Sequence, residues 1–532
     1  MILPILIFLL SLSYRFAGIL DNHPFWVDEF SSANQARLLL EYGSSYFNNP
    51  LINVEFNNVI AHSLIALSFA VFGQNEWVAR LPFVLIGSLV PVATFFLARL
   101  IFGTPVGVIA SLLTSTSYFL ITWSRQARSY PLTQLCMLLT LYFYFRITSQ
   151  KNPQKYLLAL FIAVSLFGVL THYLFWILLG TLFLDSLFRF RTQLKTIVKN
   201  PLFFVGSVVL FFTLMLFGIP QSLFNFMLHG MSPVNNAWYY HSFLWREYGL
   251  ISFLAFMGIL GSFKKHFSSV SIVVGYMIIH VLFLVFFFPP YTSRYLLPIF
   301  PLLFIFTAFT LNKFMNAAVT VNFAGIKREH LSMAGTLFLT AFIILNGYKF
   351  DIKPNPFYSV NHDFREIALI DYKQVYDIIK EKGDLDEGKT AVIDTWHDRL
   401  YWYLGTDFYA PYIFRWAADP GTTNGLSHTT RFIINKEGEK LIPRQERLIL
   451  IAELSDLKKA MNKYPKGFIF IDDASMPADV IKYVQENFHQ ELFLNRYPLD
   501  DNPLSDWPAT LYSWGIEESL PVDNVPDTTT NP

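Results

Sequence analysis

The sequence predicts a mainly α-helical, polytopic bundle of about 11–13 transmembrane spans, followed by an α/β domain. Two observations predict this division. Of the 532 residues, 53% are hydrophobic and only 15% are charged, whereas soluble domains average about 25% charged residues. Residues 1–349 hold 30 charged side chains, 21 basic and 9 acidic, and residues 350–532 hold 49, 19 basic and 30 acidic. The composition therefore excludes a single soluble domain, an intrinsically disordered chain and a dedicated nucleic-acid binder.

Apolar runs of transmembrane length account for most of residues 1–349. A bilayer core about 30 Å thick requires about 20 apolar residues per helix. The clearest runs are residues 2–20, 81–99, 105–123, 131–147, 156–171, 174–188, 202–218, 249–262, 268–288, 295–311 and 332–347. A shorter run at 59–73 either crosses the membrane or lies in its interface. The first run has no basic residue before it and no small-residue cleavage site after it, so we expect a retained span rather than a removed signal peptide.

The distribution of Lys and Arg predicts the orientation, because basic loops stay on the cytoplasmic side. The loops rich in Lys and Arg are 146–155, 189–199, 264–266 and 313–328. If these are cytoplasmic, the region after residue 349 is extracytoplasmic. An amino terminus on the inside then demands an odd number of crossings, which the eleven clear runs satisfy if 59–73 does not cross.

The sequence pattern of residues 350–515 predicts a soluble extracytoplasmic α/β domain. Short apolar runs such as AVIDTW, RFIIN and GFIFIDD alternate there with polar helical stretches such as DLKKAMNKY and ADVIKYVQENF, which is typical of alternating strands and helices. Residues 516–532 have nothing to bury, and we expect a disordered tail. The single cysteine, Cys136, excludes an intramolecular disulfide framework and a multi-cysteine metal site.

The predicted outer loop of residues 21–58 carries adjacent carboxylates. Asp28 and Glu29 follow Phe25 and Trp26 shortly after the first span. One interpretation is structural: Asp28 caps an amphipathic surface helix and Glu29 lies in its first turn. The other is that a carboxylate at the membrane surface accepts a proton from an acceptor hydroxyl. The two interpretations are compatible, because a capping carboxylate can still face a cavity.

Four arginines lie near the predicted outer ends of the spans: Arg80, Arg125, Arg128 and Arg294. Charges so close to hydrocarbon are costly, and the ordinary explanation for each one is a side chain that extends to the membrane interface. A cluster of such cations requires an anion. The phosphate of a lipid carrier suits it, because a guanidinium binds phosphate through two parallel hydrogen bonds.

Further polar and aromatic side chains of the outer loops are candidates for binding sugar or acceptor. Trp238 and Tyr239 belong to the run AWYYHSFLWREYG, which is typical of an interfacial aromatic belt as well as of a sugar platform. His172, in a turn between two spans, is either a ligand-binding or a packed interfacial histidine, and Glu55 and His62 have the same two interpretations. The sequence contains no Gly-rich phosphate loop, HExxH or paired CxxC motif, so a cytosolic nucleotide site has no support.

Several motifs occur in an order that resembles a known family. A first span is followed by WVDE, then by GQNEWVARLPFVLIGSLVPVATFFLARLIFG, SRQARSYPL, THY and SRYLLPIFP. Over roughly residues 1–312 the chain resembles the polytopic glycosyltransferases of the GT-C class, in the group with dolichyl-phosphate-mannose protein mannosyltransferases and the bacterial aminoarabinose transferases of lipid A. The resemblance identifies residues 1–349 as a transmembrane glycosyltransferase domain with its catalytic loop at 21–58.

The resemblance implies transfer of a hexosyl or pentosyl group, with inversion, from a polyprenyl-phosphate donor to a protein, lipid or glycan hydroxyl. It implies that Asp28 is the general base, with Glu29 its neighbour, and that Arg80, Arg128 and Arg294 bind the donor phosphate. It also implies an integral protein of a bacterial plasma membrane, in contact with membrane lipids and without a nucleic-acid partner.

Two points of this comparison leave the chemistry open. The transfer requires no cofactor, although two adjacent acids could hold a divalent metal ion. Many relatives carry His-Pro-Pro where this chain has Phe56, Asn57 and Asn58. That stretch lines the outer cavity in the proteins it resembles, so the identity of the acceptor is open.

Two other classes of function fit part of the sequence. A flippase or exporter of lipid-linked sugars would also need many spans and phosphate-binding arginines. Such transporters often have two related halves and charges deep in the bundle, and the sequence shows neither. A non-catalytic membrane receptor would explain the C-terminal domain but would leave the arginines and the two carboxylates without a role.

Overall fold

The computed structural model divides the chain into two compact units, which we describe separately. The helical unit comprises Met1–Asn22 and Gln35–Glu366, and the sheet unit comprises His23–Asn34 and Ile367–Pro532. The residues described are 2–20, 24–48, 58–150, 154–189, 191, 215, 224, 227–228, 231–290, 292–320, 326–348, 371–385, 388–405, 409–417, 429–442, 448–472, 476–495 and 508–516. The predicted tail falls outside them from residue 517 onward, as does nearly all of the predicted run 202–218.

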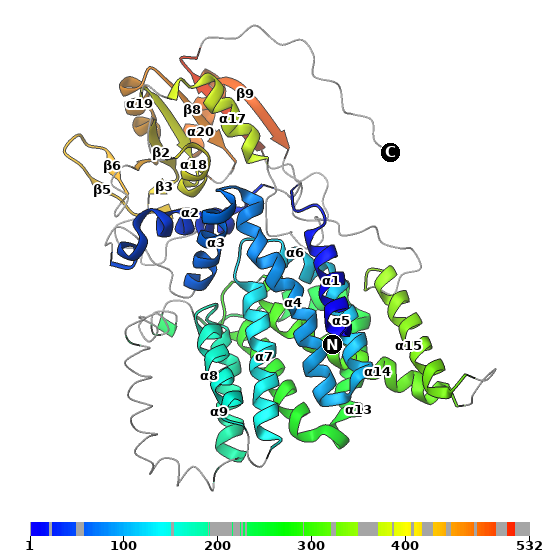
Figure 1. The fold of residues 1–532 in the computed structure, drawn as a ribbon. Coiled ribbons are helices and arrows are strands. Elements are labelled where there is room, and N and C mark those ends of the chain that lie inside the picture. Colours follow the sequence, from blue (N-terminus) through cyan, green and yellow to red (C-terminus); the bar gives the residue numbers. More distant parts are fainter. Residues whose placement is uncertain are drawn as a thin grey trace. The chain divides into compact units, whose positions relative to one another are not determined.

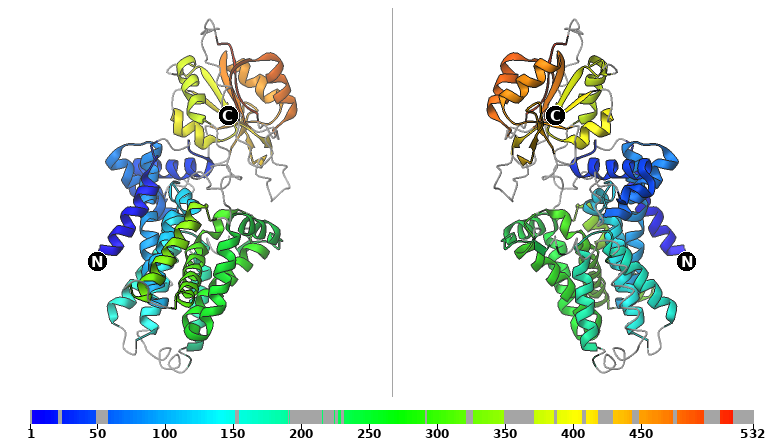
Figure 2. Two further views of the ribbon diagram at one scale, coloured as in Figure 1. Left: turned by 90° about the vertical axis from the view of Figure 1, so that its right-hand side faces the viewer. Right: turned by 90° about the vertical axis from the view of Figure 1, so that its left-hand side faces the viewer.

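The helical unit is a bundle of apolar helices (Figures 1 and 2). Its helices are α1 (Ile2–Phe16), α3 (Val59–Phe72), α4 (Glu76–Phe102), α5 (Thr104–Thr116), α6 (Tyr118–Ser124), α7 (Tyr130–Thr148), α8 (Lys155–Val169), α9 (Phe175–Arg189), α13 (Ala237–Phe286), α14 (Phe300–Ala318) and α15 (Arg328–Leu345), with the 3-10 segments η1 (Gly43–Asn48) and η4 (Ser293–Ile299). A further helix, α2 (Val27–Tyr42), begins in the sheet unit and ends in the helical unit.

Three helices of the described residues are long and apolar enough to cross a membrane: Glu76–Phe102, Ala237–Phe286 and Ser293–Ala318. Helices α5 and α6 make a fourth if this pair, bent by 60°, is one span. Shorter apolar helices are Ile2–Phe16, Val59–Phe72 and Lys155–Val169. The predicted helical bundle with a C-terminal α/β domain is therefore confirmed, and the number of crossings stays a prediction.

Helices α13 and α14 pack closely through small and hydroxyl side chains. A Cβ atom on Gly258 would lie only 2.2 Å from the carbonyl oxygen of Phe306, so no larger residue fits at position 258 without moving a backbone. Nearby, the Thr310 hydroxyl donates a hydrogen bond of 2.7 Å to the Leu254 carbonyl. Small residues and hydroxyl bonds of this kind hold helices together in lipid, where the hydrophobic effect does not.

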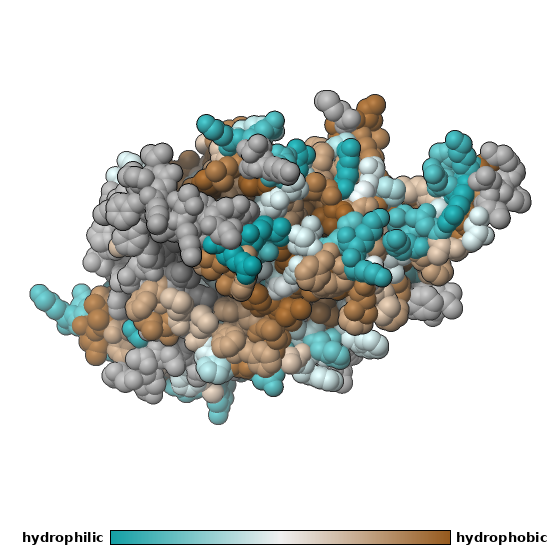
Figure 3. Space-filling view, turned by 90° about the horizontal axis from the view of Figure 1, so that it is seen from below, coloured by the Kyte–Doolittle hydropathy of each residue, from teal (hydrophilic) through white to brown (hydrophobic). Residues whose placement is uncertain are grey.

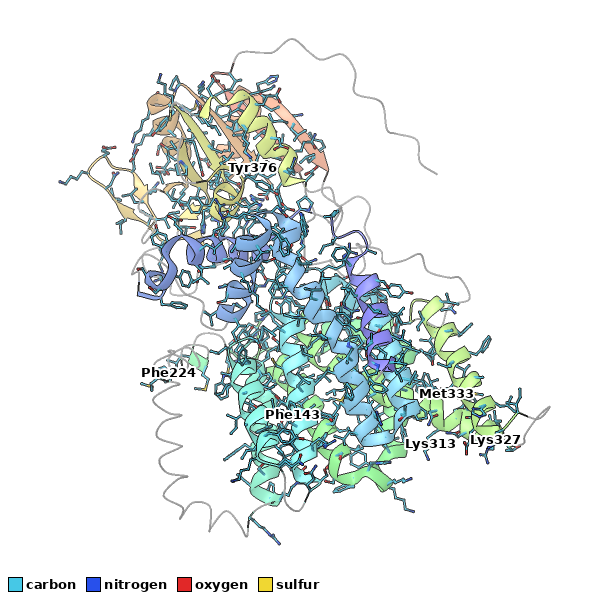
Figure 4. All side chains as sticks on the ribbon, viewed as in Figure 1. Phe143, Phe224, Lys313, Lys327, Met333 and Tyr376 are labelled. Atoms are coloured by element: carbon cyan, nitrogen blue, oxygen red, sulfur yellow. The ribbon has the colours of Figure 1, made fainter. Side chains whose placement is uncertain are left out.

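Basic side chains gather at one end of the helical unit. Lys313 near the end of α14 and Lys327 just before α15 both lie there (Figure 4). The two helices are joined by a hydrogen bond of 2.7 Å from the Ser332 hydroxyl to the Asn316 side chain. Seen from this end, hydrophilic side chains interrupt a largely hydrophobic surface (Figure 3). Lys313 and Lys327, which flank the predicted basic loop, therefore lie at the same end of the helical unit, and the cytoplasmic side of that loop remains a prediction.

The break between α5 and α6 is stabilised by a buried arginine from α1. The Arg15 guanidinium is fully buried and donates hydrogen bonds to the carbonyls of Ser115 (3.0 Å) and Thr114 (3.3 Å). It also donates to the hydroxyls of Ser11 (2.7 Å) and Ser124 (3.2 Å). A broken helix frees carbonyl groups that lipid cannot satisfy, and Arg15 supplies the missing donors.

We expect Arg15→Leu to destabilise the protein by about 2–4 kcal/mol, because hydrogen bonds to charged groups contribute about 1.5–3 kcal/mol and buried carbonyls lose their donors. Arg15→Lys keeps the charge but lacks the planar fork and should recover only part of the loss. Thermal unfolding of the purified variants in detergent measures both effects. Melting temperatures equal to that of the wild type in both variants would contradict this role.

The sheet unit is an eight-stranded sheet with helices on both faces (Figure 1). The strand order is β5-β6-β7-β2-β1-β8-β10-β9, with β7, β2, β1 and β8 parallel and the outer pairs antiparallel. The strands are β1 (Thr390–Asp394), β2 (Ala410–Phe414), β5 (Ile433–Ile434), β6 (Lys440–Leu441), β7 (Ile449–Ile451), β8 (Lys466–Ile471), β9 (His489–Asn495) and β10 (Pro508–Trp514), with a separate pair β3 (Trp416–Ala417) and β4 (Thr429–Thr430).

Among the described residues of this unit, four helices cover the sheet: α17 (Tyr372–Lys382), α18 (His397–Leu404), α19 (Leu454–Lys463) and α20 (Ala478–Asn487). Leu457 of α19 and Val480 of α20 share a core with Ile469 and Ile471 of β8. Tyr372 of α17 instead packs on Phe470, with 6.1 Å between ring centres. Because neighbouring residues of a strand point to opposite faces, α17 lies on the face opposite α19 and α20.

A buried ion network lies where β1 and β8 end. Arg399 of α18 pairs with Asp394 at the end of β1 and, at 2.5 Å, with Asp472 just after β8. Tyr376 of α17 is labelled in Figure 4, and its hydroxyl donates a hydrogen bond to Asp394. Burial lowers the pKa of Arg399, but the two carboxylates raise it well above its usual value. Arg399 therefore stays charged and ties the ends of two parallel strands to α18.

Candidate functional site

Three of the predicted residues come together in the helical unit around the turn between α8 and α9. His172 lies in this turn, and its ring centre is 5.7 Å from that of Tyr130 and 5.9 Å from that of Tyr295. Burial, followed by the charges of Arg128 and Arg294, lowers the pKa of His172 to about 3. Charges act on a pKa in this way only from nearby. Arg294 and His172 line the same small cavity, and the charge of Arg128 acts on the same histidine. We call these three residues the arginine cluster.

Arg294 is held among aromatic rings at the start of η4. Its guanidinium carbon lies 5.7 Å from the ring centre of Trp123 and 5.5 Å from that of Tyr295, within the range of cation–π attraction. The arginine borders a cavity of about 10 Å³ whose other lining residues are Tyr130, Thr133, His172, Leu174, Tyr295, Leu297 and Pro298. This space holds about one water molecule, so it is a crevice beside the guanidinium and not a pocket for a sugar.

Side chains from two helices fix the backbone that carries Arg294. Nε2 of His280, on α13, lies 2.8 Å from the Tyr295 carbonyl oxygen. The Gln134 amide of α7 donates a hydrogen bond of 2.6 Å to the Leu297 carbonyl. Both polar groups are buried, and a buried polar group without a partner would be costly. These bonds therefore position η4 and Arg294 with it.

His172 is a neutral hydrogen-bond donor at neutral pH. With a pKa of about 3 its ring carries no charge at pH 7. The backbone N–H of Leu174 donates to its Nδ1 at 3.2 Å, so the ring proton is assigned to Nε2. A neutral donor beside two guanidinium groups suits an anionic ligand, because it adds a hydrogen bond without repelling the cations.

The low pKa of His172 predicts a pH dependence of stability. An unfolded chain protonates histidine below a pKa of about 6.5, whereas the folded chain does so only below about 3. The unfolded state therefore binds the extra proton in this window, and the folded state loses stability as the pH falls through it. We expect the melting temperature of His172→Gln, relative to the wild type, to rise as the pH is lowered from about 7 to about 4. A difference that does not change with pH would contradict the buried neutral ring.

The other two of the four candidate arginines have different surroundings. Arg125 donates a hydrogen bond of 2.7 Å to the Gly18 carbonyl, where the chain leaves α1 with a left-handed φ of 68°. Arg125 thus has a structural role at the end of the first predicted span. Arg80 is buried near the start of α4, and its role as a phosphate ligand remains a prediction.

Asp28 and Glu29 belong to the sheet unit. Both lie in the first turn of α2, where the structural interpretation places Glu29. The predicted cap position is wrong, because the helix begins at Val27, one residue before Asp28. Asp28 is partly buried and Glu29 fully buried. Asp28 is thus the more accessible of the two carboxylates.

The candidate residues for sugar and acceptor binding differ in how far they are buried. Trp238 and Tyr239 lie in the first turn of α13, where the Trp238 side chain is 79% exposed. Exposed aromatic rings on a helix are typical of the membrane interface. His62 is buried in α3, and Glu55 lies outside the described residues. For Trp238 both interpretations therefore stay open.

Three tyrosines of the arginine cluster were not predicted. Tyr130, Tyr173 and Tyr295 each stand inside the motifs SRQARSYPL, THY and SRYLLPIFP, next to the charged and histidine residues that the sequence analysis selected. Burial, followed by Tyr295 and Tyr130, raises the pKa of Tyr173 well above its usual value. The Tyr173 side chain therefore remains a neutral phenol.

Comparison with known proteins agrees with this fold. The family model of dolichyl-phosphate-mannose-protein mannosyltransferase matches residues 59–218, which include Arg80, Arg128 and His172. No curated protein sequence matches the chain.

Solved structures of low sequence identity share the architecture. ArnT from Cupriavidus metallidurans in the apo state has a TM-score of 0.57 at 12% identity, over 96% of this chain and 97% of that one. ArnT bound to undecaprenyl phosphate has a TM-score of 0.56 at 12% identity, with the same coverage. The oligosaccharyltransferase AglB from Archaeoglobus fulgidus, in complex with an inhibitory peptide and a dolichol-phosphate, has a TM-score of 0.51 at 10% identity, over 96% and 76%. The chain therefore has the fold of the GT-C membrane glycosyltransferases, and the resemblance predicted from its motifs is confirmed.

Proposed function

We propose that the chain transfers a sugar from a polyprenyl-phosphate donor to an acceptor hydroxyl on the extracytoplasmic side of a bacterial plasma membrane, with inversion at the anomeric carbon. The arginine cluster carries this proposal, because Arg128 and Arg294 present two cations around a neutral donor, His172. A lipid phosphate is the ligand in two structures of the same fold, ArnT with undecaprenyl phosphate and AglB with a dolichol-phosphate.

The donor phosphate needs stabilisation and no strong acid. The bond from the anomeric carbon to the phosphate oxygen breaks, and its electron pair leaves with a phosphate that is already ionised. Arg128 and Arg294 stabilise the negative charge that develops on this oxygen, while His172 donates through Nε2. Arg80 is a further proposed ligand of the phosphate.

The acceptor needs a base. Its oxygen forms the new bond to the anomeric carbon from the opposite side, which inverts the configuration, and Asp28 takes the hydroxyl proton. Glu29, buried beside it, adds negative charge that favours this proton transfer. Glu55, Trp238 and Tyr239 remain candidates for holding the sugar or the acceptor.

A purified-protein assay with a labelled polyprenyl-phosphate hexose tests the proposal. Label on an acceptor hydroxyl supports it, and this result should persist in EDTA because the scheme needs no metal ion. Movement of the intact lipid across a vesicle without transfer would indicate a flippase. If neither transfer nor movement of the lipid is observed, a non-catalytic receptor is favoured. The acceptor itself, whether protein, lipid or glycan, can be identified by mass spectrometry of cell-envelope glycans from a strain that lacks the gene.

A further inference from the structure

The segment that carries Asp28 and Glu29 is packed into the sheet unit. Residues His23–Asn34 group with Ile367–Pro532, although more than 300 residues separate them in sequence. Phe25 and Phe30 are fully buried there. The Phe25 ring centre lies 5.0 Å from that of Trp402, and the Phe30 ring centre lies 5.6 Å from that of Tyr403. Both partners belong to α18.

A hydrogen bond fixes the same segment at a residue that follows the two carboxylates in sequence. The Asn34 side-chain amide donates to the Asp398 carbonyl of α18 at 2.8 Å. Phe25 precedes Asp28, whereas Phe30 and Asn34 follow it. Contacts with α18 therefore hold the chain both before and after Asp28.

The aromatic residues that contact this segment pack against the buried ion network. Tyr403 stacks on Tyr376 with 4.7 Å between ring centres and 19° between planes, and Tyr376 donates to Asp394. Phe30 also packs on Tyr372, at 5.9 Å, and the Arg399 guanidinium carbon lies 4.5 Å from the Tyr372 ring centre. A buried network of ion pairs and hydrogen bonds has few alternative arrangements. The two aromatic partners of Phe30 are thus fixed by the core of the sheet unit.

We infer that α17 and α18 of the C-terminal domain position the carboxylate segment for catalysis, with Phe30 and Asn34 as positioning residues. The inference rests on the proposed function, since it takes Asp28 to be the base. A general base acts only within hydrogen-bond reach of the proton it removes, and a displacement of about 1 Å can cost roughly 10²-fold in rate. The sheet unit supplies a rigid support for this short segment, which gives the C-terminal domain a role in the transfer step.

Replacement of the anchors in the full-length protein tests the inference. We expect Phe30→Ala to lower kcat roughly 10- to 100-fold, with the donor KM and the Kd for undecaprenyl phosphate unchanged because the arginine cluster is intact. Phe30→Leu should restore part of kcat. Asn34→Ala removes a single hydrogen bond and should lower kcat several-fold in a protein that folds normally.

A matched control separates positioning from general stability. Phe488 packs on Trp514, 5.2 Å between ring centres, in the core formed with α19 and α20. Phe488→Ala should lower the melting temperature as Phe30→Ala does but leave kcat unchanged. In an Asp28→Asn background Phe30→Ala should cause no further loss, because the base that it positions is already absent.

Three results would overturn the inference: wild-type kcat in folded Phe30→Ala and Asn34→Ala, an equal loss of kcat in Phe488→Ala, or a loss confined to donor affinity. The proposed function fails separately, if Asp28→Asn retains wild-type transfer. An inactive Asp28→Asn together with fully active Phe30→Ala and Asn34→Ala would reject the positioning role alone.

Discussion

Asp28→Asn is expected to fold and insert like the wild type but to transfer almost no sugar, with kcat lower by roughly 10²- to 10⁴-fold, the usual contribution of a general base. The amide has nearly the shape of the carboxylate but cannot take a proton. Because the proposed phosphate ligands are on other elements, the affinity for undecaprenyl phosphate should not change. Initial rates with a labelled polyprenyl-phosphate hexose, together with a lipid-phosphate binding titration, measure both quantities.

The neighbouring carboxylate provides a comparison for this variant. Glu29 is fully buried, so Glu29→Gln should reduce transfer less than Asp28→Asn does. If Asp28→Asn keeps most of the wild-type activity, Asp28 has no part in the mechanism. If Glu29→Gln is the more damaging change while both variants are folded, the roles of the two acids are reversed.

Arg294→Gln is expected to weaken the binding of undecaprenyl phosphate roughly 10- to 100-fold, since hydrogen bonds to charged groups contribute about 1.5–3 kcal/mol. The transfer rate should fall as well, because charge on the leaving phosphate loses a cation. Arg294→Lys keeps the positive charge but cannot form bidentate hydrogen bonds to the phosphate, so it should give an intermediate affinity. Isothermal titration in detergent and initial-rate kinetics test these expectations.

Arg125 offers a matched control from the same sequence motif as Arg128. Because Arg125 donates to the Gly18 carbonyl, Arg125→Gln should lower thermal stability and leave the affinity for lipid phosphate in the folded protein unchanged. Equal affinities in the Arg294→Gln and Arg125→Gln variants would contradict the assignment of the donor phosphate to the arginine cluster.

The hydropathy pattern predicts the bundle well and its irregularities poorly. The apolar run 105–123 predicts one span, but the chain forms two helices bent by 60°. The break is stabilised by hydrogen-bond donors of Arg15, about 100 residues away in sequence. No local sequence pattern therefore predicts it. By contrast, the predicted break between the runs 249–262 and 268–288 coincides with a kink in α13, whose backbone departs from helical geometry at His266, as it also does at Tyr248.

The sequence predicts the charged residues of the candidate site but not its aromatic residues. Arg128 and Arg294 stand out because charge near hydrocarbon is costly, whereas Tyr130 and Tyr295 belong to a chain that is 17% aromatic. The grouping of residues 23–34 with the C-terminal domain rests on contacts such as Asn34 with Asp398, 364 residues apart. Tertiary packing of this kind has no periodic signal in the sequence.

The most direct test of the account is an experimental structure of the Asp28→Asn variant with its intact polyprenyl-phosphate sugar. The account predicts donor phosphate oxygens at hydrogen-bond distance, about 2.7–2.9 Å, from the guanidinium of Arg294, with residue 28 facing the anomeric carbon on the side opposite the phosphate. A donor phosphate bound away from Arg128 and Arg294, or a residue 28 that cannot reach the acceptor side of the sugar, would contradict it.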